Sequence, residues 1–293
     1  MKLDAAKANS DLAKLRELVD KFRPNVIVFD ANFIGSDVSV NSAYLSSIKD
    51  EFSIRMIGFM GDVWGTHWVE IANYWGSVAD LLLHISPSGA FERACSFSEK
   101  MLSSPYPVNT RSFFPERVKE SDLSFFGSHA YLRPFWLLNA IRVANQLGLE
   151  TNIRSHQRTS DCPDMAAYAK ILRRSKMVMN FSSRSADVKM LTGRAWQALH
   201  SGTLLLEEQN EEIEHFFVPF VHYVPFENAF QLTRLIEFFY KNQDEAETIG
   251  AGALDFCARH YNAASVWTRV LGALPQGSAK AGDGDGTMQA SIG

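Results

Sequence analysis

The sequence has few cysteines, little net charge and no long apolar run. Its 293 residues contain three widely spaced cysteines, with no CxxC motif and no histidine-containing cluster: Cys95, Cys162 and Cys257. This spacing indicates neither a disulfide framework nor a zinc site. The formal net charge of -4 creates no field that would attract a polyanion, so nucleic acid is not expected as a partner.

The apolar segments are short. No run reaches the roughly 20 apolar residues that span a bilayer, so we expect no transmembrane segment. The N-terminal segment MKLDAAKANSDLAKLRELV interleaves charged and apolar positions, which argues against a secretory signal. Together with the scarcity of cysteine, these patterns favour a cytoplasmic protein.

The sequence contains enough apolar residues for two hydrophobic cores. Apolar residues make up 46% of the chain and aromatic residues 12%, which suits about two domains of ordinary size. In residues 1–115, apolar positions at helical spacing follow Ser10, the expected cap, and precede the apolar runs NVIVFD, SIRMIGFMGD and ADLLLHIS. These runs predict a small, reduced α/β domain with about three or four strands.

A proline-rich connection ends near Phe114 to Glu120, and residues 116–274 then alternate regularly between strand and helix patterns. The strand patterns are SDLSFFGS, LETNIRS, KMVMNFS, TLLLEE and VHYVPF. Between them, an amphipathic helix ends at Gly148, and Asp164 can cap another. The alternation predicts a doubly wound parallel sheet with right-handed crossovers. Residues 275–293 are rich in Gly, Ala and Ser, and we expect them to be disordered.

Ligands of such a sheet bind beyond the carboxyl ends of the strands, which selects a few loops. Gly127 and Ser128 follow the first strand, and Arg133 opens the next helix, where a guanidinium and free NH groups could meet a phosphate. The alternative is that Gly127 only makes the turn and that Arg133 is solvated.

A second group of polar residues follows the third strand. Asn180, Ser182 and Ser183 are short polar side chains at its end, and Arg194 opens the following helix. Together they could hold a diphosphate and a ribose. Serine and asparagine at the end of a strand are also ordinary turn residues, so each of them alone is compatible with a purely structural role.

The blocks DLSFFGS with Arg133, DMAAYAKILRRSKMVMNFS, GRAWQALHSGTLLLEE and ARHYNAASVWTRVL resemble the CgeB-like, or spore maturation protein-like, glycosyltransferases in order and spacing. The resemblance covers the C-terminal half well and the N-terminal half loosely. It implies a GT-B fold of two Rossmann-like domains, with residues 116–274 binding a nucleotide-diphosphate sugar and residues 1–115 facing an acceptor. It also implies that Gly127, Arg133 and Arg194 surround the diphosphate.

The same resemblance implies transfer of the sugar to a glycan, protein or small-molecule acceptor. No cofactor and no metal ion are expected, because Arg133, Arg194 and helix amino ends would neutralise the departing diphosphate.

Two positions depart from the pattern of the resembled family. Gln197 stands where that family has a glutamate, and Lys189 stands where retaining GT-B enzymes often have another. An amide still forms hydrogen bonds but brings no charge to a developing cation. One hypothesis is therefore an active glycosyltransferase, and the other is a binding protein with weak or no turnover. A sugar-nucleotide epimerase would need several convergent acids, which the sequence does not provide.

Further acidic residues could contact sugar hydroxyls. Glu207 and Glu208 follow the fourth strand, and the alternative is a solvated acidic loop that continues to Glu214.

The acceptor side of the predicted cleft would come from the segment GDVWGTHW. Asp62 or His67 could accept a proton from an acceptor hydroxyl, and Trp64 and Trp68 could stack on a sugar ring. The alternative places both tryptophans in the core with His67 as their polar neighbour.

Overall fold

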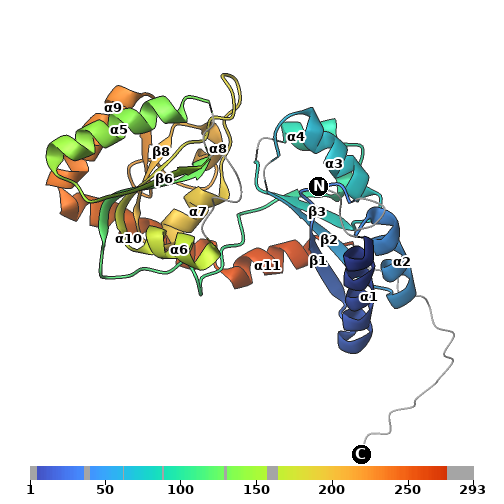
Figure 1. Ribbon diagram of the computed structural model, residues 1–293. Helices are drawn as coiled ribbons and strands as arrows, with labels where there is room; N and C mark the ends of the chain where they lie inside the picture. Colours follow the sequence, from blue (N-terminus) through green and yellow to red (C-terminus); the bar gives the residue numbers. More distant parts are fainter. Residues whose placement is uncertain are drawn as a thin grey trace, which may run out of the picture.

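The chain forms two parallel β-sheets that lie side by side, each covered by helices (Figure 1). The structure is a computed structural model that describes residues 5–35, 40–61, 63–87, 89–128, 131–156 and 164–275. Asp62, Cys162 and nearly all of the expected disordered tail lie outside these residues.

The N-terminal sheet has four parallel strands in the order β1-β2-β3-β4, within the expected range. Its elements are α1 (Ala5–Phe22), β1 (Val26–Asp30), α2 (Ser42–Phe52), β2 (Arg55–Met60), α3 (Thr66–Gly76), β3 (Leu81–His84), α4 (Ala90–Ala94), the 3-10 helix η1 (Ser98–Lys100) and β4 (Met101–Ser103). The expectation that Ser10 caps the first helix is wrong, because α1 begins at Ala5 and Ser10 lies within it. The alanine-rich segment before Ser10 has high helix propensity and extends the helix backwards.

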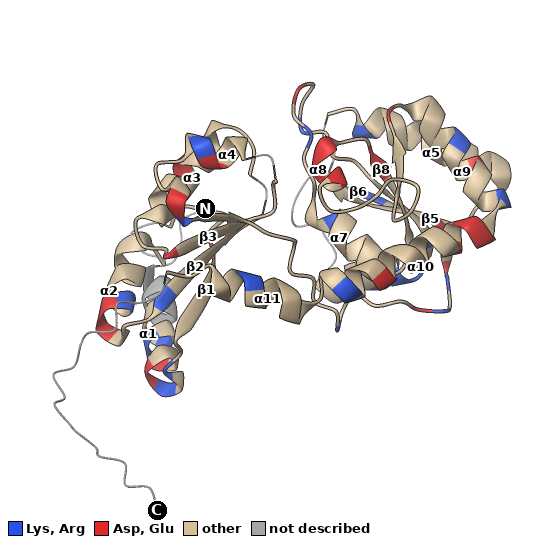
Figure 2. Ribbon diagram, turned by 180° about the vertical axis from the view of Figure 1, so that it is seen from behind, with Lys and Arg blue, Asp and Glu red and all other residues tan. Residues whose placement is uncertain are grey.

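The two faces of this sheet are covered by different parts of the chain. Met60 of β2 packs in one cluster with α2 and α3, whereas Ile57 points to the opposite face. There it meets Val266 and Val270 of α11 (Ala263–Gly272). Opposite views in Figures 1 and 2 both show α11 lying between the two halves. Helix α11 thus completes the hydrophobic core on this face of the N-terminal sheet.

The C-terminal sheet has five parallel strands in the order β6-β5-β7-β8-β9, which confirms the predicted α/β fold. Its elements are β5 (Ser121–Ser128), α5 (Arg133–Leu147), β6 (Thr151–His156), α6 (Met165–Arg173), β7 (Ser175–Asn180), α7 (Gly193–His200), β8 (Leu204–Glu208), α8 (Glu211–Glu214), β9 (Val224–Phe226), α9 (Ala229–Lys241) and α10 (Gln243–His260). Two predicted helix ends are confirmed. Gly148 closes α5 in a left-handed conformation, and the Asp164 side chain accepts a hydrogen bond from Ala167 N at the start of α6.

Helices cover both faces of the C-terminal sheet. One core cluster packs strand residues such as Phe125 against α5 and α9, and the other packs residues such as Val178 against α6, α7 and α10. β5 lies between β6 and β7. After β5 the chain therefore forms β6 on one side of it and then crosses over to form β7 on the other side. This reversal opens a crevice at the carboxyl ends of β5 and β7, the usual ligand position in such sheets.

Candidate active site

Arg194 passes over the end of β5 where Gly127 lies. It is the second residue of α7, and its Nη1 donates a hydrogen bond to the carbonyl oxygen of Phe126 at 2.8 Å. A Cβ atom on Gly127 would lie 2.0 Å from this nitrogen, far inside van der Waals contact. Gly127 therefore makes room for the guanidinium at the carboxyl end of the strand.

A cavity of about 700 Å³ lies between the two halves at this point, and we call it the central cavity. The C-terminal half contributes Gly127, Ser128, Thr192, Gly193, Arg194 and Gln197 to its lining. The amino end of α7 thus opens into the cavity, where the dipole of the helix favours an anion. The N-terminal half contributes aromatic side chains.

Arg133 joins the loops that follow β5 and β7. Its side chain is 2% exposed and donates to Ser128 Oγ at 3.0 Å and to the carbonyl oxygen of Phe181 at 3.1 Å. The alternative of a solvated Arg133 is therefore wrong. Because Arg133 is buried below the cavity lining, its direct effect is to fix the two loops relative to each other.

Asn180 is buried and contacts the cavity lining. Its Nδ2 donates to Thr192 Oγ1 at 3.0 Å, which holds a residue of the cavity lining, and to Glu207 Oε2 at 2.8 Å. Ser182, also buried, donates from Oγ to the carbonyl oxygen of Glu208 at 3.2 Å. Asn180 thus supports the cavity lining, whereas Ser182 ties the segment after β7 to the end of β8.

Glu207 is fully buried, and burial raises the pKa of its carboxyl group to about 8, against the lowering effect of the Asn180 hydrogen bond. Glu208 is 3% exposed and accepts from Ser183 N at 2.8 Å, while Lys189 Nζ lies 3.5 Å from its Oε1. The alternative of a solvated acidic loop is wrong for these two residues, although Glu211 and Glu214 are exposed.

Gln197 is held by a residue that the sequence analysis did not select. Tyr168 of α6 donates its hydroxyl hydrogen to Gln197 Oε1 at 2.9 Å, and both side chains line the central cavity. Burial raises the pKa of the Tyr168 phenol, so it remains a donor at neutral pH. The only sequence signal for Tyr168 was its place on the apolar face of a helix, which is typical of core residues.

The acceptor-side residues are dispersed. Asp62 lies outside the described residues, and His67 is exposed in the first turn of α3 without lining the central cavity. Trp68 is half-buried and lines the central cavity, whereas Trp64, 39% exposed, lines a second cavity of about 910 Å³. The alternative that both tryptophans are core residues is wrong for Trp64.

A polar contact joins the two halves beside this second cavity. Ser86, after β3, donates its hydroxyl hydrogen to the Glu212 carboxylate, which also accepts from Leu191 N at 2.7 Å. Burial raises the pKa of Glu212. Neither Ser86 nor Glu212 was selected from the sequence, because only the tertiary fold brings them together.

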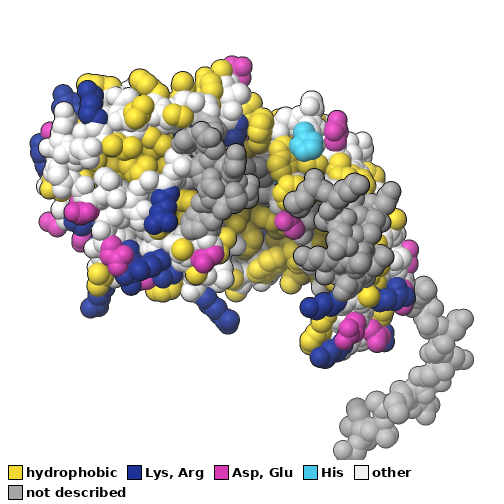
Figure 3. All heavy atoms as spheres, in the orientation of Figure 1, with side chains coloured by type: hydrophobic (Ala, Val, Ile, Leu, Met, Phe, Trp, Pro, Cys, Tyr) yellow, Lys and Arg dark blue, Asp and Glu magenta, His cyan; other side chains and the backbone are white. Residues whose placement is uncertain are grey.

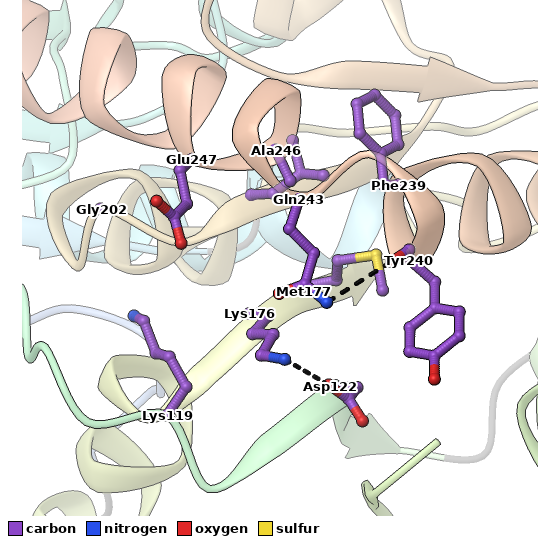
Figure 4. Close-up of a pocket in the computed structure, with 11 residues that line it drawn as sticks. Lys119, Asp122, Lys176, Met177, Gly202, Phe239, Tyr240, Gln243, Ala246 and Glu247 are labelled. Atoms are coloured by element: carbon purple, nitrogen blue, oxygen red, sulfur yellow. Dashed lines mark hydrogen bonds and ion pairs between the residues drawn. The ribbon is translucent and has the colours of Figure 1, made fainter. Parts of the chain in front are cut away.

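Another cavity, of about 40 Å³, lies at the opposite edge of the C-terminal sheet (Figure 4). Lys176 and Asp122 form an ion pair of 2.8 Å there, near the amino ends of β7 and β5. Its small volume and its place at the amino ends of the strands make it a poor site for a nucleotide.

In the described part of the chain, no three His, Cys, Asp or Glu side chains are grouped so that they could hold a metal ion. No helix in that part is both long and apolar enough to cross a bilayer.

Comparison with solved structures finds the same two-sheet arrangement in glycosyltransferases. Anabaena HepE in complex with UDP-glucose matches with a TM-score of 0.56 at 11% identity, covering 90% of this chain and 81% of that chain. Sucrose-phosphate synthase from Thermosynechococcus elongatus matches with a TM-score of 0.59 at 10% identity, covering 92% and 77%. A glycosyltransferase from Rickettsia africae matches with a TM-score of 0.52 at 10% identity, covering 93% and 82%.

The fold and the cleft between its two Rossmann-like sheets define a protein of GT-B architecture. In sequence, the family described as glycosyl transferase-like matches residues 111–272, more than half of the chain. The chain belongs to this family and is a transferase of the glycosyltransferase class. A sequence comparison with curated proteins finds no match.

Proposed function

We propose that this glycosyltransferase binds a nucleoside-diphosphate sugar in the central cavity and transfers the sugar to an acceptor held by the N-terminal half. The observation that carries the proposal is the placement of Arg194 over Gly127, at the amino end of α7 and facing the cavity. A guanidinium and a helix amino end together favour a diphosphate. The complex of HepE with UDP-glucose makes uridine nucleotides the first ligands to test.

In the proposed reaction, an acceptor oxygen forms a bond to the anomeric carbon while the bond from that carbon to the diphosphate breaks. The electron pair leaves with the diphosphate, and its growing negative charge is stabilised by Arg194 and the NH groups at the start of α7. We propose that these groups suffice without a divalent cation. Addition of EDTA should then leave turnover unchanged.

The remaining residues would have supporting roles. Gln197, fixed by Tyr168, would offer its amide to ribose or sugar hydroxyls, while Arg133 and Asn180 hold the loops that form the lining. Asp62 is the proposed base by its sequence position alone. Within the family, we propose the CgeB-like group, on the sequence blocks that resemble it.

A nucleotide screen with purified protein tests this proposal. Thermal unfolding is measured with UDP, GDP, ADP, TDP and their sugars, because a ligand of the native state raises the unfolding temperature. We expect one nucleotide to stabilise the protein and its sugar to be hydrolysed or transferred. Arg194→Ala should weaken this binding by about tenfold or more, whereas Arg234→Ala, at an exposed arginine outside the cavity, should not. Equal nucleotide binding by both variants would contradict the proposal.

The hypothesis of a binding protein without turnover rests on Gln197, Lys189 and the reduced N-terminal domain. The same screen separates the binding protein from the enzyme. Binding of a nucleotide sugar with no hydrolysis and no transfer to any acceptor would favour the binding protein. Hydrolysis that is lost in Arg194→Ala would favour the enzyme.

A further inference from the structure

The N-terminal face of the central cavity is apolar and largely aromatic. We call this face the acceptor wall, and its members are Phe33, Phe59, Trp68, Ile85 and Tyr106. Phe33 is 75% exposed and Ile85 is buried, while the other three are half-buried. Figure 3 shows hydrophobic side chains gathered where the two halves face each other. An exposed apolar surface of this kind inside a cleft is typical of a ligand site.

The acceptor wall adjoins the place where the donor is proposed to bind. The rings of Phe59 and Tyr106 meet edge to face, with centroids 5.9 Å apart. Tyr106 in turn packs on Gly193, where a Cβ atom would lie 2.9 Å from its Cε2. Gly193 is the first residue of α7 and directly precedes Arg194. A molecule on this wall would therefore lie beside a diphosphate at the start of α7.

The charged side chains among the described residues of the central cavity all come from one of its two halves. Among the described residues that line it, the charged side chains are Arg184 and Arg194, and both come from the C-terminal half. The acceptor wall itself consists of uncharged side chains. An ionised acceptor group placed against this wall would lose hydration, and no side chain of the wall itself would supply a counter-charge. The wall thus favours an uncharged acceptor.

The polar neighbour of the wall is already engaged. Asn32 lines the same face, but its Oδ1 accepts from Gly61 N at 2.7 Å and its Nδ2 donates to Asp30 Oδ1 at 2.5 Å. Sugar rings also stack on aromatic side chains, but their recognition requires polar groups that converge on the hydroxyls. Because the hydrogen bonds to Gly61 and Asp30 leave Asn32 with one N–H and one lone pair for sugar hydroxyls, the wall suits an aromatic ring better than a saccharide.

We propose that the acceptor carries its hydroxyl group on a planar aromatic skeleton that packs against the acceptor wall. This inference rests on the proposed function and names the acceptor class. The hydroxyl oxygen bonds to the anomeric carbon of the donor, the bond from that carbon to the diphosphate breaks, and the hydroxyl proton passes to the base proposed above, Asp62. The products are an aryl glycoside and the nucleoside diphosphate.

Binding of 4-methylumbelliferone, followed by its fluorescence, tests the wall without any donor. Phe33→Ser should weaken this binding about tenfold, because the variant removes one ring from the contact surface. Phe33→Tyr keeps a ring and should bind as the wild type does. Phe22→Ser is the matched control, since Phe22 is 67% exposed and lies outside the cavity lining. Both serine variants change exposed side chains, so the fold should be retained.

Cellobiose provides the competing class of acceptor. We expect cellobiose neither to displace 4-methylumbelliferone nor to accept sugar. The aromatic probe should accept sugar from the donor that the nucleotide screen identifies. Wild-type affinity in Phe33→Ser, or transfer to cellobiose in place of the aromatic probe, would overturn the inference.

Nucleotide binding is recorded separately on the same variants. Phe33→Ser should retain the nucleotide-dependent rise in unfolding temperature, because Arg194 and α7 are unchanged. A nucleotide shift without any aromatic binding overturns the acceptor inference alone. Aromatic binding without any nucleotide shift overturns the proposed function, and with it the acceptor role of the probe.

Discussion

Gly127 and Arg194 are so close that a Cβ atom at position 127 would lie 2.0 Å from Nη1 of Arg194, and the guanidinium would have to move. The contact joins the end of β5 to the start of α7, two elements separated by more than 60 residues in sequence. It sets the position of the guanidinium that we propose for diphosphate binding.

Gly127→Ala should therefore displace the Arg194 side chain and weaken nucleotide binding. We expect a loss of about tenfold, the range of one charged hydrogen bond, measured by calorimetric titration with the nucleotide that the screen identifies. Gly272→Ala is the control, because a Cβ atom there meets nothing within 4 Å. Unchanged affinity in Gly127→Ala would show that the guanidinium position is not important for binding.

Gln197 and Tyr168 give a second prediction. Tyr168→Phe removes the donor to Gln197 Oε1 and should lower kcat several-fold, because the amide loses its fixed orientation. Gln197→Glu keeps an acceptor for Tyr168 but adds a charge, and in a working site we expect turnover to fall by about tenfold. Steady-state kinetics with the identified donor checks both variants. A large gain in turnover for Gln197→Glu would instead indicate a site disabled by its amide.

Glu207 should make stability depend on pH. Its pKa is raised to about 8 by burial, whereas an unfolded glutamate titrates near about 4.3. Between these values the native state holds a proton that the unfolded state has lost, so the free energy of unfolding falls as the pH rises. Glu207→Gln removes this titration and should flatten the dependence.

Circular dichroism melts of both proteins from about pH 5 to about pH 8 would measure this pH dependence. Over this range the Tm of the wild type should fall by a few degrees more than the Tm of Glu207→Gln. Glu211→Gln is the control, because Glu211 is exposed and its variant should follow the wild type. Parallel curves for Glu207→Gln and the wild type would mean that Glu207 is ionised in the native protein.

The contact between Ser86 and Glu212 should stabilise the arrangement of the two halves. Glu212→Ala leaves the Ser86 hydroxyl and the Leu191 NH without their acceptor, which costs about 1–3 kcal/mol and a Tm decrease of several degrees. Glu211→Ala, at the exposed neighbouring position, should change Tm little. Differential scanning calorimetry compares the two variants. Equal Tm values would show that the contact does not stabilise the protein.

A second kinetic comparison separates the roles of Asp62 and His67. His67 is exposed and lies outside the central cavity lining, so His67→Ala should keep turnover within about twofold of the wild type. Asp62→Asn should lower kcat by about 100-fold or more if Asp62 is the base. A severe loss in His67→Ala with normal turnover in Asp62→Asn would reverse the assignment.

Local patterns were sufficient for most elements of the fold. Gly148 and Asp164 predicted their helix ends correctly, because capping depends on residues within one turn of each other. The burial of Glu207 and Glu208 was missed for the opposite reason. The run of acids after β8 is polar in sequence. Partners that are distant in sequence, Asn180 and the loop carrying Ser183, bury these carboxyl groups together with the nearer Asn210.

The sequence by itself determined two α/β units, every strand of both sheets except β4, and the glycine and arginine that meet at the cleft, because periodicity and turn residues act over a few positions. The tertiary structure alone decided which residues face the cavity. It placed Tyr168 against Gln197, buried Arg133 below the lining, and brought α11 back onto the N-terminal sheet. Such placements depend on packing between distant segments, and no local pattern records which segments will meet.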